Sequence, residues 1–160
     1  MSNGKMGQIV VAAVGRLKKS PWKVAQGDYL KRLQHYTNIS LAEVKDSVGR
    51  GFPDAVAMQR EGEALLAATE GAQRLILLTP AGRQFTSEQF SAYLLREIEL
   101  YGRLAFLIGG PLGFDPGVEA AADEQMALSS LTFPHEMARV VLLEQLYRAF
   151  TILRSEPYHK

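Results

Sequence analysis

The chain has 160 residues, of which 47% are hydrophobic and 22% are charged, and this is the size and composition of a single globular domain. The net charge of +1 excludes a strongly basic nucleic-acid coat protein, and the absence of cysteine excludes a disulfide framework and a thiolate zinc site. No apolar run approaches the roughly 20 residues of a membrane span, and no signal peptide is recognisable, so we expect a cytoplasmic protein without a membrane anchor.

Strand-like apolar runs alternate with helical segments along the chain. Residues 1–7 are polar and without pattern, which predicts a flexible leader before one domain over residues 8–160. The expected strands are 8–14, 38–44, 74–79 and 104–108, the expected helices are 21–36, 54–68, 86–101, 117–123 and 134–153, and residues 126–133 are expected to be extended. The alternation predicts an α/β fold with a mostly parallel sheet of about five strands flanked by helices.

A basic trio, Arg16, Lys18 and Lys19, follows the first strand. It is consistent with a solvated loop or with RNA contact, and we favour the solvated loop because charge runs are usually surface decoration. In the helix that follows, Trp22 is expected to be a core anchor and Val24 an inner residue.

The chain is organised around residues 104–114, where an apolar run stops at three glycines and a proline. Five apolar residues without alternation predict a strand covered on both faces, and the glycines allow backbone N–H groups to approach a ligand closely. Open α/β sheets bind cofactors at such loops, although a glycine turn that only joins strand to helix is equally consistent. No Gly-x-Gly-x-x-Gly follows the first strand, and no phosphate-binding Gly-Lys-Ser/Thr loop is present.

The last helix is apolar nearly all round, from Pro134 to Leu153. A helix that packs on one side should show a single apolar stripe. We therefore expect it to pack on the sheet and also on a second copy of the chain, with Leu142 and Leu146 as candidate interface positions.

Four motifs, found in order between Gln8 and the C-terminus, carry a family resemblance. They are Ile108-Gly109-Gly110-Pro111-x-Gly113, Leu128-Ser129-Ser130-Leu131-Thr132-Phe133-Pro134-His135, Arg139-Val140 with Glu144-Gln145-Leu146-Tyr147-Arg148-Ala149, and Pro157-Tyr158-His159-Lys160. In these motifs the chain resembles the RlmH family of SPOUT-class ribosomal RNA methyltransferases. The resemblance implies methyl transfer from S-adenosylmethionine to N3 of a pseudouridine in 23S rRNA, on the assembled ribosome, by a homodimer. It also implies a C-terminal trefoil knot.

The resemblance also assigns cofactor-binding positions, which are Leu78, Gly109, Leu128, Ser129, Ser130, Leu131, Thr132 and Phe133. The chemistry agrees, because adenine needs apolar walls and backbone hydrogen bonds, which leucines and glycine loops supply. Any one of these leucines, taken alone, is more typical of a core residue.

The C-terminal residues are the candidates for catalysis. The resemblance implies that His159 and Tyr158 accept the N3 proton or position the group that accepts it. Weaker candidates, for contact with RNA phosphate, are Arg139, Arg148 and Lys160. Glu144 and Arg148 are spaced for a salt bridge within the helix. The three histidines, His35, His135 and His159, are too scattered to predict a metal site.

Two other classes of protein remain open from the residues. A ribosome-binding or RNA-binding module without catalysis could keep the fold and the basic loops. An α/β enzyme with another adenosine cofactor could use the same glycine loops.

Overall fold

The computed structural model describes residues 4–160, which form one parallel sheet between two layers of helices. The sheet has five strands in the order β2-β1-β4-β3-β5, and every pair of neighbours is parallel. The strands are β1 (Gln8–Val14), β2 (Asn38–Val44), β3 (Arg74–Arg83), β4 (Arg103–Ile108) and β5 (Glu124–Met126). The helices are α1 (Pro21–Leu33), α2 (Asp54–Ala68), α3 (Ser87–Tyr101), α4 (Pro116–Ala121) and α5 (His135–Leu153). The expected parallel α/β sheet of about five strands is confirmed.

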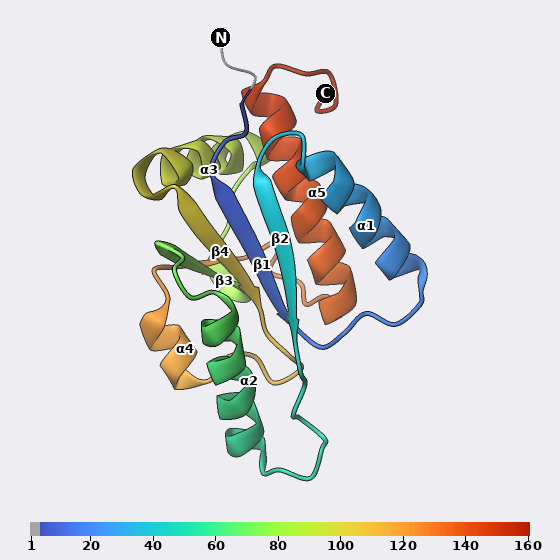
Figure 1. Ribbon diagram of the computed structural model, residues 1–160, viewed down its shortest axis with the longest axis vertical. Helices are drawn as coiled ribbons and strands as arrows, with labels where there is room; N and C mark the ends of the chain where they lie inside the picture. The colour runs from blue at the N-terminus through green and yellow to red at the C-terminus, as the bar shows by residue number, and fades with distance from the viewer. Residues whose placement is uncertain (1–3) are drawn as a thin grey trace.

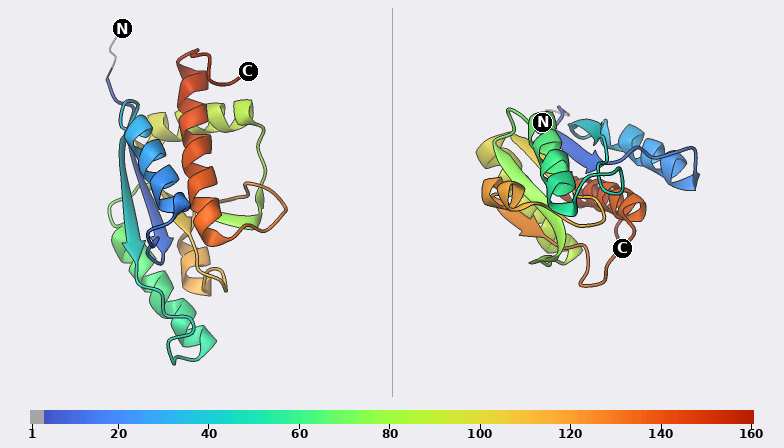
Figure 2. Two further views of the ribbon diagram at one scale, coloured as in Figure 1. Left: turned by 90° about the vertical axis from the view of Figure 1, so that its right-hand side faces the viewer. Right: turned by 90° about the horizontal axis from the view of Figure 1, so that it is seen from below.

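Two hydrophobic clusters lie on opposite faces of the sheet. On β4, Leu104, Phe106 and Ile108 pack into the cluster that contains residues of α1, α3 and α5. Ala105 and Leu107 pack into the other cluster, with Leu65 of α2 and Val118 of α4. The two views of Figure 2 show these helix layers on either side of the sheet. Because both faces are covered, β4 reads as a continuous apolar run, as predicted.

Local sequence signals set several element boundaries. Thr86 and Gln89 form the expected capping box at the start of α3, and Gly102 ends that helix with a φ of 75°. Ser20 caps α1, and Pro21 occupies its first turn. Helix α1 ends at Leu33, three residues before the predicted end, because a turn at residues 34–36 leads directly into β2.

Strand β3 differs from the prediction, since it continues past Pro80 to Arg83 instead of stopping at a glycine turn. The register with β5 shifts between Leu78 and Arg83, so Pro80 lies where no ladder hydrogen bond is required from its nitrogen. A Cβ on Gly82 would lie 2.6 Å from the backbone of Met126, so only glycine fits where these segments meet. Strand β3 is therefore four residues longer than predicted.

Helix α5 also differs from the prediction. It packs against the sheet, α1 and α3 of the same chain, and Leu142 and Leu146 are fully buried there. These intrachain contacts explain why the helix is apolar nearly all round. The choice of Leu142 and Leu146 as interface positions was therefore wrong, whereas a second copy of the chain stays a prediction.

Two smaller expectations are also corrected. Val24 is 75% exposed and is not an inner residue of α1, while Trp22 is half-buried and belongs to neither hydrophobic cluster. In the expected leader, residues 1–3 lie outside the described residues. Met6, in contrast, packs against the core and donates its backbone N–H to the Tyr36 carbonyl at 2.6 Å.

Candidate active site

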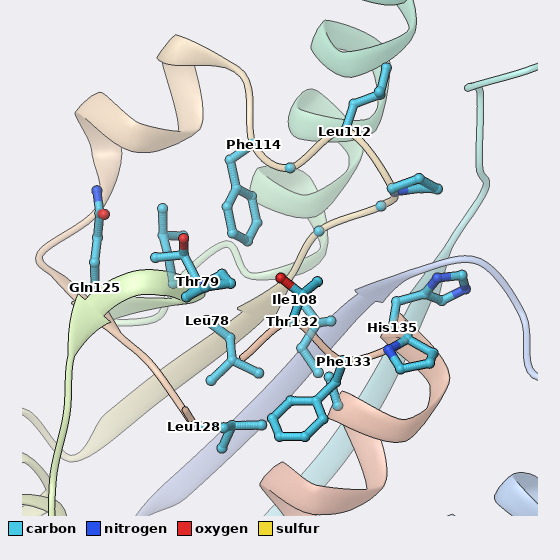
Figure 3. A pocket seen from close by; sticks show the side chains of 18 of the residues that line it. Leu78, Thr79, Ile108, Leu112, Phe114, Gln125, Leu128, Thr132, Phe133 and His135 are labelled. Carbon is cyan, nitrogen blue, oxygen red and sulfur yellow. The ribbon is translucent and has the colours of Figure 1, made fainter. Parts of the chain in front are cut away.

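A pocket of about 480 Å³ lies at the carboxyl ends of β3 and β4. Three segments far apart in the sequence form its walls, namely residues 77–80, residues 108–114 and residues 128–135. Figure 3 shows Leu78, Leu128 and Phe133 on one side of this space and Phe114 across from them. The carboxyl edge of a parallel sheet is where open α/β folds bind their ligands.

The structure brings together seven of the eight residues that the resemblance assigns to the cofactor. Those that line the pocket are Leu78, Gly109, Leu128, Ser129, Leu131, Thr132 and Phe133, whereas Ser130 does not line it. Leu131 is 71% exposed and Leu112 is 42% exposed, so both leave apolar surface open at this pocket. Exposed apolar side chains beside a pocket are typical of a surface that a ligand or partner covers.

The glycine loop leaves little room for side chains at Gly109 and Gly110. A Cβ on Gly109 would lie 3.3 Å from the Gly113 backbone and from the Phe114 ring. A Cβ on Gly110 would lie 2.8 Å from Glu61 Oε1. The loop closes on itself through a hydrogen bond from the Gly113 N–H to the Gly110 carbonyl at 3.0 Å.

Glu61 of α2 lies beside the glycine loop, and the sequence did not single it out as a functional residue. Its side chain accepts hydrogen bonds from the backbone N–H groups of Ser47 and Val48, at 2.7 and 3.1 Å, and the residue is only 3% exposed. A buried carboxylate is stable when it has such donors. Glu61 therefore fixes the loop after β2, and its other carboxylate oxygen lies beside Gly110 of the glycine loop.

Arg139, expected to contact RNA phosphate, is 1% exposed and occupied by protein partners. Its guanidinium donates to Glu43 Oε2 at 2.6 Å and to the Gly15 carbonyl at 3.0 Å, with longer contacts to Gln26 and Val14. This burial corrects the expectation. Arg139 fastens α5 to the carboxyl ends of β1 and β2.

The C-terminal tail does not reach the pocket of its own chain. The Tyr158 hydroxyl donates to Glu144 Oε1 at 3.1 Å, and its ring lies edge-on to Tyr147. His159 Nδ1 lies 3.2 Å from Arg148, and its Nε2 lies 2.9 Å from Glu88. The expected salt bridge between Arg148 and Glu144 is present at 2.6 Å. The tail therefore folds back along α5 (Figure 1), away from the pocket at the other end of that helix.

Burial and hydrogen bonding keep the hydroxyl of Tyr158 protonated. Burial, followed by hydrogen bonding to Tyr29 and to the Glu144 carboxylate, raises the pKa of this phenol well above its ordinary value. In this arrangement Tyr158 is a hydrogen-bond donor and not a base. Lys160 is exposed at the end of the chain.

Pocket residues that the sequence did not single out are Thr79 and Gln125, together with Ala138 on α5. His135 also lines the pocket. Within residues 4–160, no group of three or more histidine, aspartate or glutamate side chains is placed to hold a metal ion. Over the same residues, no helix combines the length and the apolar character that crossing a bilayer would need.

A parallel α/β domain with a glycine-loop pocket at its carboxyl edge belongs to the class of α/β proteins that bind cofactors or substrates there. A family model described as "Predicted SPOUT methyltransferase" matches residues 7–159. The chain therefore belongs to the SPOUT methyltransferase family, which confirms the class of the sequence resemblance.

Two relatives share nearly the full length of the chain. "Ribosomal RNA large subunit methyltransferase H" of Oleidesulfovibrio alaskensis is 45% identical over 155 residues, covering 96% of this chain and 99% of the relative. The protein of the same name from Ruminiclostridium cellulolyticum is 41% identical, with the same two coverages. At this identity and coverage the chain belongs to the family of these relatives.

Solved structures support the fold. A probable methyltransferase from Bordetella pertussis Tohama I matches with a TM-score of 0.52 and 14% identity, covering 92% of this chain and 95% of the other. A probable methylase family protein from Haemophilus influenzae Rd KW20 matches with a TM-score of 0.56 and 13% identity, covering 92% of this chain and 66% of the other. At such low identity these two matches bear on the fold alone.

Proposed function

We propose that this protein transfers the methyl group of S-adenosylmethionine to N3 of a pseudouridine in 23S rRNA on the assembled ribosome, in the cytoplasm. The observation that carries the proposal is the pocket. The segments that the family resemblance assigns to the cofactor, at Leu78, Gly109 and residues 128–133, are separated by 30 and 18 residues of sequence and yet line one cavity at the carboxyl edge of the sheet. The names of the near-full-length relatives support the ribosomal RNA substrate.

The residues of the pocket fit S-adenosylmethionine. Leu78, Leu128 and Phe133 provide apolar walls for adenine, and the glycine loop brings backbone close to the cavity because Gly109 and Gly110 carry no side chains and have little room for them. The cofactor supplies an activated methyl group. The protein must then align it with the attacking nitrogen, and orientation of this kind contributes up to about 7–11 kcal/mol in ideal cases.

The N3 imide must also lose its proton, and we assign that step to the tail. His159 has an imidazole nitrogen that can accept a proton, while Tyr158, held as a neutral phenol, can donate a hydrogen bond that positions the base. Arg148, beside both residues, and Lys160 are the basic groups placed to contact RNA phosphate. Since the tail is remote from the pocket of its own chain, it serves the pocket of a second copy in a homodimer.

A face for such a dimer remains on α5 after its intrachain contacts are made. Met137, Val141 and Gln145 are half-buried and follow one another at helical spacing, so they form one stripe without a charged group. The C-terminal trefoil knot is the other property that membership of the SPOUT class supports. Its consequence is slow refolding from denaturant, which stopped-flow kinetics would measure.

Two measurements test the function. Isothermal titration with S-adenosylmethionine should give micromolar binding, and an absence of binding would favour the RNA-binding module that lacks catalysis. Tighter binding of a different adenosine cofactor would favour an α/β enzyme that uses that cofactor. Mass spectrometry of 23S rRNA from cells that lack the protein should then show one pseudouridine without its N3 methyl group, and an unchanged methylation pattern would refute the proposed substrate.

A further inference from the structure

The distribution of charge along the chain is strongly uneven. Residues 1–27 contain five of the 18 lysines and arginines and none of the 17 acidic residues. Four of the five lie between Arg16 and Lys23, in the loop after β1 and the first turn of α1. We propose that this segment, residues 16–23, is the surface on which the phosphate backbone of the rRNA lies while the target base enters the pocket. The inference rests on the proposed function.

The loop is built to present its charges outward. Leu17 is 2% exposed, and its N–H donates to Glu43 Oε2 at 2.9 Å. The buried Arg139 guanidinium holds both this carboxylate and the Gly15 carbonyl. With the backbone fixed at residues 15 and 17, Arg16 and Lys18 remain exposed on either side of the buried leucine.

These cations lack the ion pairs and aromatic contacts that eight of the other 14 lysines and arginines make within residues 4–160. Arg32, Arg50 and Arg74 form ion pairs with aspartate or glutamate, and Arg83 and Arg154 lie over aromatic rings. Arg16, Lys18, Lys19 and Lys23 are exposed and make no ion pair within residues 4–160. The first turn of α1 also lacks an acidic residue, so like charges gather at the positive end of its macrodipole. Folding alone gives no reason for that arrangement, whereas a bound polyanion does.

The basic loop lies beside the pocket. Strands β1 and β4 are paired in parallel, with Ala13 opposite Ile108, so the loops that leave them start next to each other. A Cβ on Gly110 would lie 3.4 Å from Val14, which shows how closely the glycine loop approaches the end of β1. On α5, Ala138 lines the pocket, and Arg139, the next residue, bonds to Gly15. A nucleotide in the pocket therefore has its flanking backbone within reach of the loop.

The chemistry of the loop favours RNA over an acidic protein. RNA carries a phosphate at every nucleotide, so several neighbouring lysine and arginine side chains can each contact one. Binding also releases the counterions that surround the phosphates. Trp22, half-buried and outside both hydrophobic clusters, adds an aromatic surface among the cations, as is typical where unstacked bases are held. Because the whole chain has a net charge of only +1, RNA contact must be local, and this is where the positive charge gathers.

The test compares two variants of equal net charge, K18Q/K19Q in the loop and K31Q/R96Q on exposed positions of α1 and α3 away from it. Methylation of intact ribosomes is followed as a function of salt. For K18Q/K19Q we expect the KM for ribosomes to rise on the order of tenfold and the logarithmic salt slope to fall by about 2, since each lost phosphate contact lowers it by about 1. The kcat and the affinity for S-adenosylmethionine should stay within about twofold of wild type, and K31Q/R96Q should behave as wild type.

An unchanged salt slope in K18Q/K19Q, or an equal change in K31Q/R96Q, would overturn the assignment of the loop. A wild-type protein that fails to methylate ribosomes would instead refute the proposed function, so the two failures are distinguishable. Ultraviolet crosslinking of the wild-type protein to ribosomes gives a second result that needs no variant. We expect nucleotide adducts on residues 16–23, and adducts to ribosomal proteins there in place of nucleotides would show that the partner is a protein.

Discussion

Replacing Arg139 with methionine should destabilise the fold without a direct effect on RNA binding. The change removes a guanidinium that is 1% exposed and bonds to Glu43 Oε2 at 2.6 Å and to the Gly15 carbonyl at 3.0 Å. Breaking a fully buried ion pair costs about 3–5 kcal/mol because it strands the other charge. Here the cost is smaller, since the Glu43 side chain is 28% exposed and keeps one donor, the Leu17 N–H.

A second feature also lowers the cost. Arg139 Nε is buried without a partner among the described residues, so methionine removes an unsatisfied donor together with the satisfied ones. We therefore expect Arg139→Met to lower the free energy of unfolding by about 2–4 kcal/mol, a large part of the roughly 5–15 kcal/mol of a whole domain.

Urea unfolding of the wild type, R139M, E43Q and the double variant R139M/E43Q would measure this. If the pair acts as the structure indicates, the double variant costs less than the sum of the two single variants, with a coupling of at least about 1 kcal/mol. A loss below about 1 kcal/mol in R139M, together with a reduced salt slope for ribosome binding, would refute the structural role and restore contact with phosphate.

Three further changes separate cofactor binding, chemistry and assembly. Gly109→Val should abolish binding of S-adenosylmethionine in a calorimetric titration, because even a Cβ added there would lie only 3.3 Å from the Gly113 backbone and the Phe114 ring. Retained affinity would place the cofactor elsewhere. Deleting residues 158–160 should leave that affinity within a few fold but lower methyl transfer by about 10²–10⁴, and full activity would return the tail to a structural role. Val141→Glu should give a monomer of 17.7 kDa by light scattering where the wild type gives twice that mass, and an unchanged mass would exclude the α5 stripe as the interface.

The substrate itself supplies another comparison. A protein with a net charge of +1 and one local cluster of cations cannot hold naked RNA tightly, so specificity should come from the shape of the folded ribosomal surface. Methylation of protein-stripped 23S rRNA should therefore be much slower than methylation of intact ribosomes in a tritium-transfer assay. Equal rates on the two substrates would contradict this reasoning.

The sequence predicts those parts of the fold whose signals are local. Strands β1 and β4 are apolar without alternation, and the capping box at Thr86 fixes the start of α3 within a residue. Pro80 misled the prediction, because a proline ends a strand only where the ladder requires its N–H group. The register shift beside Pro80 depends on β5, more than 40 residues later, and leaves no trace nearby.

Contacts with distant parts of the chain also decide the roles of the charged residues and of α5, and the local sequence does not show them. Glu61 and Arg139 both read as ordinary surface positions on helices, since their partners lie elsewhere in the chain and burial of a lone charge is rare. An all-round apolar helix is equally consistent with a second copy and with neighbours in the same chain. Only the tertiary structure shows that α1 and α3 provide those neighbours.

Tyr158 offers the clearest test of how the tail takes part in the reaction. Burial, then hydrogen bonding to Tyr29 and to the Glu144 carboxylate, raises the pKa of its phenol well above the ordinary value of about 10. The hydroxyl therefore stays protonated throughout the range in which the enzyme works, and removing it should lower kcat without moving any limb of the pH–rate profile. Tyr158→Phe, which keeps the ring against Tyr147, isolates the hydroxyl, and His159→Gln is the comparison in which a basic nitrogen is lost. Single-turnover rates between about pH 6 and 9 decide the matter, because loss in Tyr158→Phe of the limb in which the rate rises with pH would make the phenol the base, whereas loss of that limb only in His159→Gln assigns proton removal to the imidazole.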